Sequence, residues 1–256
     1  MNGPDEIICY NRCVKNEKPQ VNEMLGKING RFGRNSHSLK KKKTGEDFIL
    51  FHNRQDAGRQ LAEKLNHIDV KNAVVLALPR GGVPLGIEIA RKHQLDFDVL
   101  LSKKIGHPYQ PEYAIGAVSE SGDPLLNRME TDRIEDDWLE REVKVLRKQM
   151  TNRRQMYAKW LETKAVKGRP VIIVDDGIAT GLTMKAAINA VIDQGAEKII
   201  IAVPVIPMDT YRTLKKAVDQ VVAVEVPDYF LGAVGAYYDH FPQVEDNEVE
   251  KLLKSL

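Results

Sequence analysis

One stretch of the chain, residues 171–183, constrains the fold and the ligand more than any other. It begins with four consecutive β-branched residues, which predict a strand buried on both faces of a parallel sheet. Residues 184–194 follow as an amphipathic helix that ends at Gly195. A loop of small residues therefore joins the carboxyl end of a strand to the amino end of a helix.

The chemistry of this loop indicates a sugar phosphate as the ligand. Free backbone N–H groups, the positive end of the helix dipole and the hydroxyls of Thr180 and Thr183 suit a phosphate monoester. Asp175 and Asp176 come directly before the loop, where they repel a phosphate but accept hydrogen bonds from neutral hydroxyls. We therefore expect a diol on the two aspartates. The alternative is a buried strand that ends in an acidic turn and binds nothing.

These residues resemble the phosphoribosyl diphosphate (PRPP) signature of type I phosphoribosyltransferases, which has four apolar residues, two acids and a Thr-Gly-x-Thr loop. The resemblance implies that Asp175 and Asp176 bind the 2′ and 3′ hydroxyls of the ribose. It also implies that the loop holds the 5′-phosphate through Gly177, Ile178, Ala179, Thr180, Gly181 and Thr183.

A second strand and loop precede this motif. Residues 73–78 predict a central parallel strand, and two glycines after it, Gly81 and Gly82, let the backbone approach a ligand closely. In type I phosphoribosyltransferases the corresponding loop binds pyrophosphate and often contains a non-proline cis peptide. The resemblance therefore implies pyrophosphate contacts from Arg80, Gly81 and Gly82, and a cis bond between Pro79 and Arg80. The alternative is an ordinary turn with a surface arginine.

A third loop is expected after the strand at residues 97–101. A basic pair followed by Gly106, two prolines, polar residues and Glu112 predicts an exposed, mobile loop at residues 102–112. It stands at the position of the family's flexible catalytic loop, which implies that Lys103, Lys104 and His107 are candidates to reach the pyrophosphate. The alternative is a solvated loop with incidental lysines.

The remaining periodicity completes an α/β fold with right-handed crossovers, in which the ligand loops share one edge of the sheet. The resemblance implies a Rossmann-like parallel sheet flanked by helices, with a small hood. Short apolar runs predict further strands at 48–51, 114–118, 198–203 and 221–224, and amphipathic patterns predict helices at 55–65, 85–92, 208–218 and 245–253.

A long, highly charged helix is expected at about residues 131–163, with Thr131 as its N-cap. Such a helix braces a sheet or a dimer more often than it carries chemistry. Its cationic residues could line an anion site or form a solvated face; they are Arg147, Lys148, Arg153 and Arg154.

The acceptor is less constrained than PRPP. Tyr229 and Phe230 follow the last strand, where the family usually sandwiches the acceptor ring; stacking on a base and simple packing are both open. Phosphoribosyltransferases that act on 6-oxopurines usually carry an aspartate where this chain has Ala179, which disfavours hypoxanthine and guanine. Asp239 or His240 could replace that proton acceptor.

Composition separates a tail from a catalytic body. The chain has 256 residues, 43% apolar and 29% charged, which suits one α/β domain at 47–256 and a basic, irregular extension at 1–46. Residues 1–43 hold ten Lys or Arg and four Asp or Glu. Such a tail is solvated, attracts a nucleic acid or membrane surface, or packs over the active site; a nucleic-acid partner is the less favoured case.

No apolar run reaches membrane-spanning length and the first ten residues lack a basic signal region, so a cytoplasmic protein without a membrane partner is expected. In that compartment Cys9 and Cys13 would be free thiols; a zinc site with His37 is the weaker alternative.

The segments Leu-Pro-Arg-Gly-Gly-Val-Pro, Lys-Ile-Gly-His-Pro and Pro-Glu-Tyr-Ala-Ile-Gly-Ala-Val resemble the bacterial predicted phosphoribosyltransferases of undefined acceptor. The resemblance implies an enzyme of nucleotide metabolism that uses PRPP and Mg²⁺ to transfer phosphoribosyl to a nitrogenous acceptor, with release of pyrophosphate. Its catalytic candidates are Arg80, Lys103, Lys104, Asp175 and Asp176. PRPP and water should hold most of the Mg²⁺ ligand positions.

Two other functions are open, namely a regulator that binds PRPP without catalysis and an inactive domain whose tail serves a protein partner. A homodimer is expected from the family resemblance alone.

Overall fold

The computed structural model describes residues 49–256, which belong to one compact α/β unit. The expected basic extension at 1–46, with Cys9, Cys13 and His37, lies outside the described residues.

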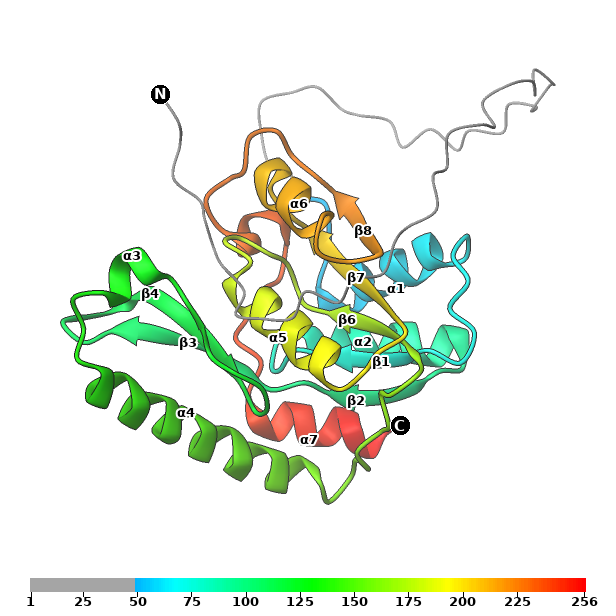
Figure 1. The fold of residues 1–256 in the computed structure, drawn as a ribbon. Helices are drawn as coiled ribbons and strands as arrows, with labels where there is room; N and C mark the ends of the chain where they lie inside the picture. The colour runs from blue at the N-terminus through cyan, green and yellow to red at the C-terminus, as the bar shows by residue number, and fades with distance from the viewer. Residues whose placement is uncertain (1–48) are drawn as a thin grey trace, which may run out of the picture. The chain divides into compact units, whose positions relative to one another are not determined.

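A five-stranded parallel sheet forms the centre of this unit (Figure 1). Its order confirms the expected α/β architecture: β2 (Asp96–Val99), β1 (Val74–Ala77), β6 (Pro170–Val174), β7 (Lys198–Val205) and β8 (Gln220–Glu225). β1 and β6 are neighbours in register, with Val74 opposite Val171 and Ala77 opposite Val174. The loops that follow these two strands therefore begin at the same level of the sheet.

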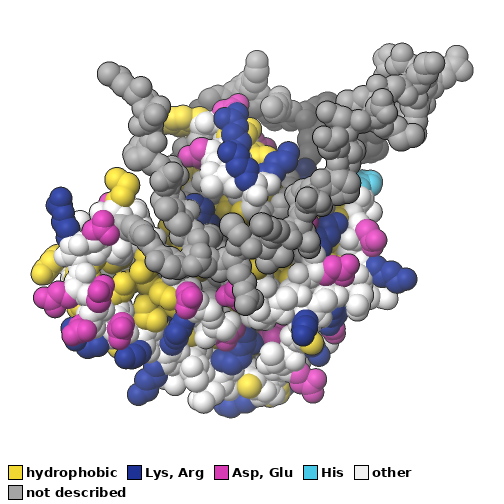
Figure 2. Space-filling view, in the orientation of Figure 1, with side chains coloured by type: hydrophobic (Ala, Val, Ile, Leu, Met, Phe, Trp, Pro, Cys, Tyr) yellow, Lys and Arg dark blue, Asp and Glu magenta, His cyan; other side chains and the backbone are white. Residues whose placement is uncertain are grey.

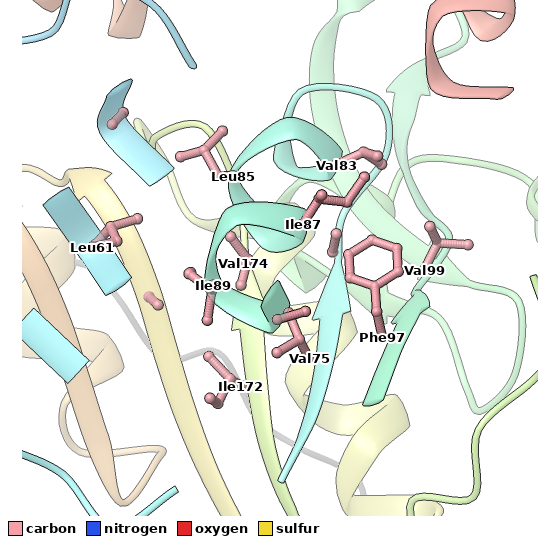
Figure 3. Packing of buried hydrophobic residues seen from close by; sticks show 14 of the residues in the cluster. Leu61, Val75, Val83, Leu85, Ile87, Ile89, Phe97, Val99, Ile172 and Val174 are labelled. Atoms are coloured by element: carbon pink, nitrogen blue, oxygen red, sulfur yellow. The ribbon is translucent and has the colours of Figure 1, made fainter. Parts of the chain in front are cut away.

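Helices cover both faces of the sheet because the strands are apolar on both sides. On one face α1 (Arg54–Leu65) and α2 (Gly82–His93) pack against alternate strand residues, and Figure 3 shows the side chains of α2 facing Val75, Ile172 and Val174. On the other face α5 (Leu182–Asp193) and α6 (Met208–Leu214) cover the intervening residues. No helix between residues 49 and 256 is long and apolar enough to cross a bilayer.

The prediction of a strand at 48–51 is wrong for residues 49–51, the part of it that the structure describes. Phe51 makes only an isolated parallel bridge to Tyr238, and the chain then turns into α1 at Asn53, whose side chain accepts from the Asp56 N–H. Phe51 is nevertheless fully buried, with its ring centroid 5.0 Å from that of Tyr238. Its apolar character reflects burial of a connecting segment and not a strand.

The loop expected at 102–112 is wrong except for a turn at residues 108–109, because the segments on either side of this turn are strands. β3 (Ser102–His107) pairs antiparallel with β4 (Gln110–Ser119), and β5 (Leu125–Leu126) completes a second, three-stranded sheet. A Cβ on Gly106 would lie 2.3 Å from the Pro111 carbonyl oxygen. The glycine that predicted a loop therefore permits the close approach of two strands.

The long helix begins later and ends earlier than expected. A short helix, α3 (Arg128–Thr131), contains Thr131, and the long helix α4 (Asp136–Tyr157) starts from Glu135 as its N-cap. The chain closes with a 3₁₀ turn, η1 (Val234–Tyr237), and with α7 (Asp246–Lys254), which packs against α2 and α4.

Arg154 anchors α4 to the edge of the sheet instead of lining an anion site. Its Nη1 donates to Asp98 Oδ1 at 2.7 Å and its Nη2 to the Val99 carbonyl at 2.6 Å, and it also pairs with Glu120. The Asp98 side chain is only 4% exposed. Of the other α4 cations, Arg153 pairs with Asp246 and Arg147 donates to the Gly122 carbonyl, while Lys148 is exposed. Charges of both signs are mixed over the α4 and hairpin region in Figure 2.

We expect Arg154→Met to lower the free energy of unfolding by about 3–5 kcal/mol, because it leaves the Asp98 carboxylate buried without its cation. Urea unfolding followed by circular dichroism measures this loss. Lys148→Met, at an exposed position of the same helix, is the control and should change stability by less than about 0.5 kcal/mol. Equal effects of the two variants would contradict an anchoring role for Arg154.

Candidate active site

The loops after β1 and β6 interlock at the carboxyl edge of the sheet. The Leu78 N–H donates to the Val174 carbonyl at 2.8 Å, which extends the pairing one step beyond the strands. A Cβ on Gly82 would lie 2.4 Å from the same carbonyl oxygen. The second glycine is therefore required by the approach of the two backbones.

The first glycine lies against an acid of the motif. A Cβ on Gly81 would lie 2.0 Å from Asp176 Oδ2 and 2.4 Å from its carboxyl carbon. Only a hydrogen fits between the β1 loop and this carboxylate. Two sequence motifs far apart along the chain thus form one packed unit.

The bond between Pro79 and Arg80 is cis, as the family resemblance implies. The Arg80 guanidinium does not point to open solvent. Its Nη1 lies 3.0 Å from Glu245 Oε2 and 3.9 Å from Asp246 Oδ2, at the acidic start of α7. An anion at Arg80 Nη1 would therefore compete with these carboxylates.

The threonine loop has the geometry of an anion site. Gly181 adopts a φ of +74°, the left-handed region that favours glycine, and serves as the N-cap of α5 without a side-chain acceptor. Because glycine has no side chain that could accept from them, the first N–H groups of α5 are not capped by Gly181. They are available for an anion at the loop that contains Thr180. Ala179 and Thr180 are exposed, while Ile178 is buried and donates its N–H to the Val205 carbonyl at 2.9 Å.

The two aspartates have different surroundings. Asp175 Oδ1 accepts from the Asp176 N–H at 2.9 Å. Burial, reinforced by the neighbouring Asp176 carboxylate, raises the pKa of Asp175 well above its usual value, and the Arg54 and Lys104 cations oppose this rise. Burial also raises the pKa of Asp176, against the opposing charge and hydrogen bond of Arg54.

Arg54 is the residue of this site that the sequence analysis missed. Its Nε donates to Asp176 Oδ2 at 2.8 Å, and its Nη1 donates to the Pro242 carbonyl at 2.6 Å. Its guanidinium carbon lies 3.7 Å from the ring centroid of Phe241, and the residue is only 7% exposed. A cation at the first position of a helix is disfavoured by the helix dipole, so Arg54 directly after the N-cap was a signal that an anion lies nearby.

The structure separates the two lysines expected to act together. Side chains alternate along β3, and Lys103 bonds Gln149 of α4, where burial and the nearby Arg153 lower its pKa. Lys104 lies on the opposite face, close enough to Asp175 to lower the pKa of that carboxyl. Lys104 is exposed, and of the two lysines it is the one whose charge acts on Asp175. His107 lies at the hairpin end and contacts Tyr109.

A cavity of about 670 Å³ adjoins the threonine loop and contains one of the two expected aromatic residues. Phe230 lines it and stacks on Tyr237 at 5.6 Å, whereas Tyr229 is 83% exposed and is not among the lining residues. The cavity is also lined by Ala179, Thr180, Pro207, Met208, Asp209, Arg212, Asp228 and Gly232. The sequence did not point to Asp209, Arg212 or Asp228, because the local pattern around each does not show that the segments after β7 and β8 converge.

The alternative proton acceptors, Asp239 and His240, are not among the residues that line this cavity. Asp239 Oδ2 is 2.9 Å from His52 Nδ1, in a pair whose side chains are 53% and 71% exposed, and His240 is exposed. Over residues 49–256, no three His, Cys, Asp or Glu side chains gather as metal ligands.

Gly81→Ala should cost about 1–3 kcal/mol of unfolding free energy, since the added methyl overlaps the Asp176 carboxylate. All the nearest atoms to that methyl belong to the Asp176 side chain. The same substitution in an Asp176→Ala background should therefore cost much less. Chemical unfolding of the four proteins measures the difference, and an equal cost in both backgrounds would show that the contact does not constrain the loops.

Asp175→Asn should raise the free energy of unfolding at pH 7. Because the folded state raises the pKa of Asp175 above its usual 3.8, the folded chain binds this proton more tightly than the unfolded chain. The carboxylate therefore lowers stability progressively as pH rises from 3.8 through the folded-state pKa.

Urea unfolding between about pH 4 and pH 8 measures this effect as a widening gap between variant and wild type. Asp132→Asn, at an exposed position, is the control and should show no such gap. An Asp175→Asn variant less stable than wild type at pH 7 would refute the expectation.

Comparisons with known proteins agree with this geometry. Residues 50–240 match the family model of the phosphoribosyl transferase domain. Two Mycobacterium tuberculosis proteins, from strains CDC 1551 and H37Rv and provisionally named phosphoribosyl transferases, are each 40% identical over 209 residues, which is 80% of this chain and 46% of theirs. The chain thus spans about half the length of the curated relatives it matches.

A solved structure, TT1426 from Thermus thermophilus, is 40% identical with a TM-score of 0.70, over 80% of this chain and 98% of that chain. By its sequence and its fold, this chain belongs to the phosphoribosyl transferase family.

Proposed function

We propose that this chain transfers a 5-phosphoribosyl group from PRPP to a nitrogenous acceptor and releases pyrophosphate. The observation that carries the proposal is the interlock of the acidic threonine loop with the Arg80 loop at one sheet edge. The first loop offers carboxylates to hydroxyls and helix N–H groups to a phosphate. The second offers backbone and a cation to a second anion, which matches the two ends of PRPP.

The first task of the site is to hold the sugar. The transition state of phosphoribosyl transfer is oxocarbenium-like at the anomeric carbon, so fixing the sugar at both its phosphate and its diol orients that carbon. We assign the phosphate to residues 177–183 and the hydroxyls to the acidic pair. The anomeric carbon then faces the β1 loop.

The second task is to neutralise the departing pyrophosphate. The β1 loop and Lys104 are placed for this role, and Arg80 joins them by exchanging Glu245 for the pyrophosphate. The acidic pair supplies hard oxygen donors but no complete ligand set, which fits a Mg²⁺ ion held mostly by PRPP and water. When bound, Mg²⁺ offsets the charge of the pyrophosphate oxygens. Lys103 belongs to the α4 contact and not to this group.

We place the acceptor in the cavity beside the threonine loop, on Phe230 and not on Tyr229. Ala179 lines this cavity and offers no proton acceptor, whereas the carboxylates of Asp209 and Asp228 can accept from N–H groups of an acceptor. A cytoplasmic location and a homodimer stay predictions.

The direct test is the pyrophosphate released from PRPP and Mg²⁺ across a panel of nucleobases and amines. Release with one acceptor supports a transferase, release without any acceptor indicates a hydrolase, and binding without release indicates the regulatory alternative. Absence of PRPP binding would overturn the proposal.

Lys104→Met should weaken PRPP binding about tenfold, while Lys103→Met should leave it nearly unchanged, because the lysines lie on opposite faces of β3. Thermal unfolding with PRPP and Mg²⁺ measures this, since a ligand at about 100 times its Kd adds about 2.7 kcal/mol of stability. Lys198→Met, at the amino end of β7, is the control. Equal losses at positions 103 and 104 would show that β3 rearranges when ligand binds.

A further inference from the structure

We propose that Arg153 of α4 is a positioning residue for Arg80, and that it acts by holding the carboxylate of Asp246 away from the Arg80 guanidinium. Arg80 is then left with one hydrogen-bonded counter-ion, Glu245, which an anionic ligand can replace. This inference rests on the proposed function, because that function gives Arg80 the task of binding pyrophosphate. It adds a role for the long helix, which touches the site only through α7.

The Asp246 carboxylate is bound on both oxygens by side chains of α4, which packs beside α7 (Figure 1). The Tyr157 hydroxyl donates to Oδ1 at 2.7 Å, Arg153 Nε lies 3.1 Å from the same oxygen, and Arg153 Nη2 donates to Oδ2 at 3.2 Å. Tyr157 is fully buried, which fixes its hydroxyl in place. Although burial acts to raise the pKa of Asp246, the hydrogen bond from Tyr157 and the charge of Arg153 lower it below its usual value.

Arg80 thus faces two carboxylates that are held with different firmness. Within the described part of the chain, its guanidinium donates one hydrogen bond, from Nη1 to Glu245 Oε2 at 3.0 Å. The Glu245 side chain is 59% exposed and, although Glu245 is the N-cap of α7, it makes no capping hydrogen bond. Asp246 Oδ2 lies 3.9 Å from the same nitrogen, outside hydrogen-bond range. Glu245 is therefore the counter-ion that exchanges at low cost, since exposed ion pairs contribute little to stability.

Loss of Arg153 would change this balance. Asp246 would lose the guanidinium that binds both its oxygens, and Arg80 Nη1 is already 3.9 Å away. The Asp246 side chain is 27% exposed, less than half the exposure of Glu245, so solvent screens its charge less. An anion would then have to displace two carboxylates from Arg80, one of them firmly held. Arg153 thus keeps Arg80 available for a ligand.

Calorimetric titration of inorganic pyrophosphate with Mg²⁺ tests this role in a double-mutant cycle of Arg153→Met and Asp246→Asn. We expect Arg153→Met to weaken pyrophosphate binding about tenfold, Asp246→Asn not to weaken it, and the double variant to bind as Asp246→Asn does, because the freed carboxylate causes the loss. A direct contact between Arg153 and the anion predicts instead the same loss in both backgrounds.

Further variants separate the freed carboxylate from the loss of positive charge. Tyr157→Phe removes a donor to Asp246 without changing any charge, and it should weaken pyrophosphate binding about two- to threefold. Arg153→Lys keeps the charge but lacks the planar fork, so it should regain only part of the affinity that Arg153→Met loses. Lys148→Met removes an exposed cation from the same helix and is the control, with unchanged affinity expected.

Ribose 5-phosphate is the second probe, because the proposed function assigns its phosphate to residues 177–183 and not to Arg80. Arg153→Met should leave the affinity for ribose 5-phosphate unchanged. General damage to the fold would lower the affinity for both probes and would count against a positioning role.

The role is overturned if Arg153→Met leaves pyrophosphate binding unchanged, if Asp246→Asn weakens it as much as Arg153→Met does, or if the loss persists in the Asp246→Asn background. If the wild-type chain binds no pyrophosphate, the proposed function fails, and the contact is then measured by urea unfolding. Arg80→Met should cost more stability in the Arg153→Met background than in the wild type, because Arg80 there pairs with Asp246. An equal cost in the two backgrounds would refute the role.

Discussion

The contact between the Gly81 backbone and the Asp176 carboxylate is the constraint on which the site depends. It exists because β1 and β6 are parallel neighbours in register, so that their loops leave the sheet at the same level. The absence of a side chain at position 81 lets the loops close on each other. The register of β1 and β6 therefore places the loop after β1 beside the two acids that follow β6.

Two adjacent buried carboxylates are costly, and the chain offsets this cost unevenly. Asp176 has a fixed guanidinium partner, whereas Asp175 has only a backbone donor and a lysine nearby. Functional sites commonly retain such unfavourable interactions because the ligand relieves them.

Much of the sheet and the loops after β1 and β6 were predictable, since buried parallel strands and glycine-rich turns are local in sequence. The cis bond at Arg80 followed from the family resemblance and is confirmed. The β3 hairpin was missed because Gly106 and Pro108 are also typical of loops, and the pairing of Lys103 and Lys104 failed with it, since a strand sends neighbours to opposite faces. Arg54 was missed because its partners, Asp176 and Pro242, are distant in sequence.

Glu245 and Asp246, at the acidic start of α7, are the counter-ions of Arg80. An incoming anion gains only the difference between its own attraction and that of the carboxylates it displaces. On the proposed function, a multiply charged diphosphate gains more from this exchange than chloride or another monovalent anion does. The acidic start of α7 would then favour a diphosphate over the weak anions that surround any protein.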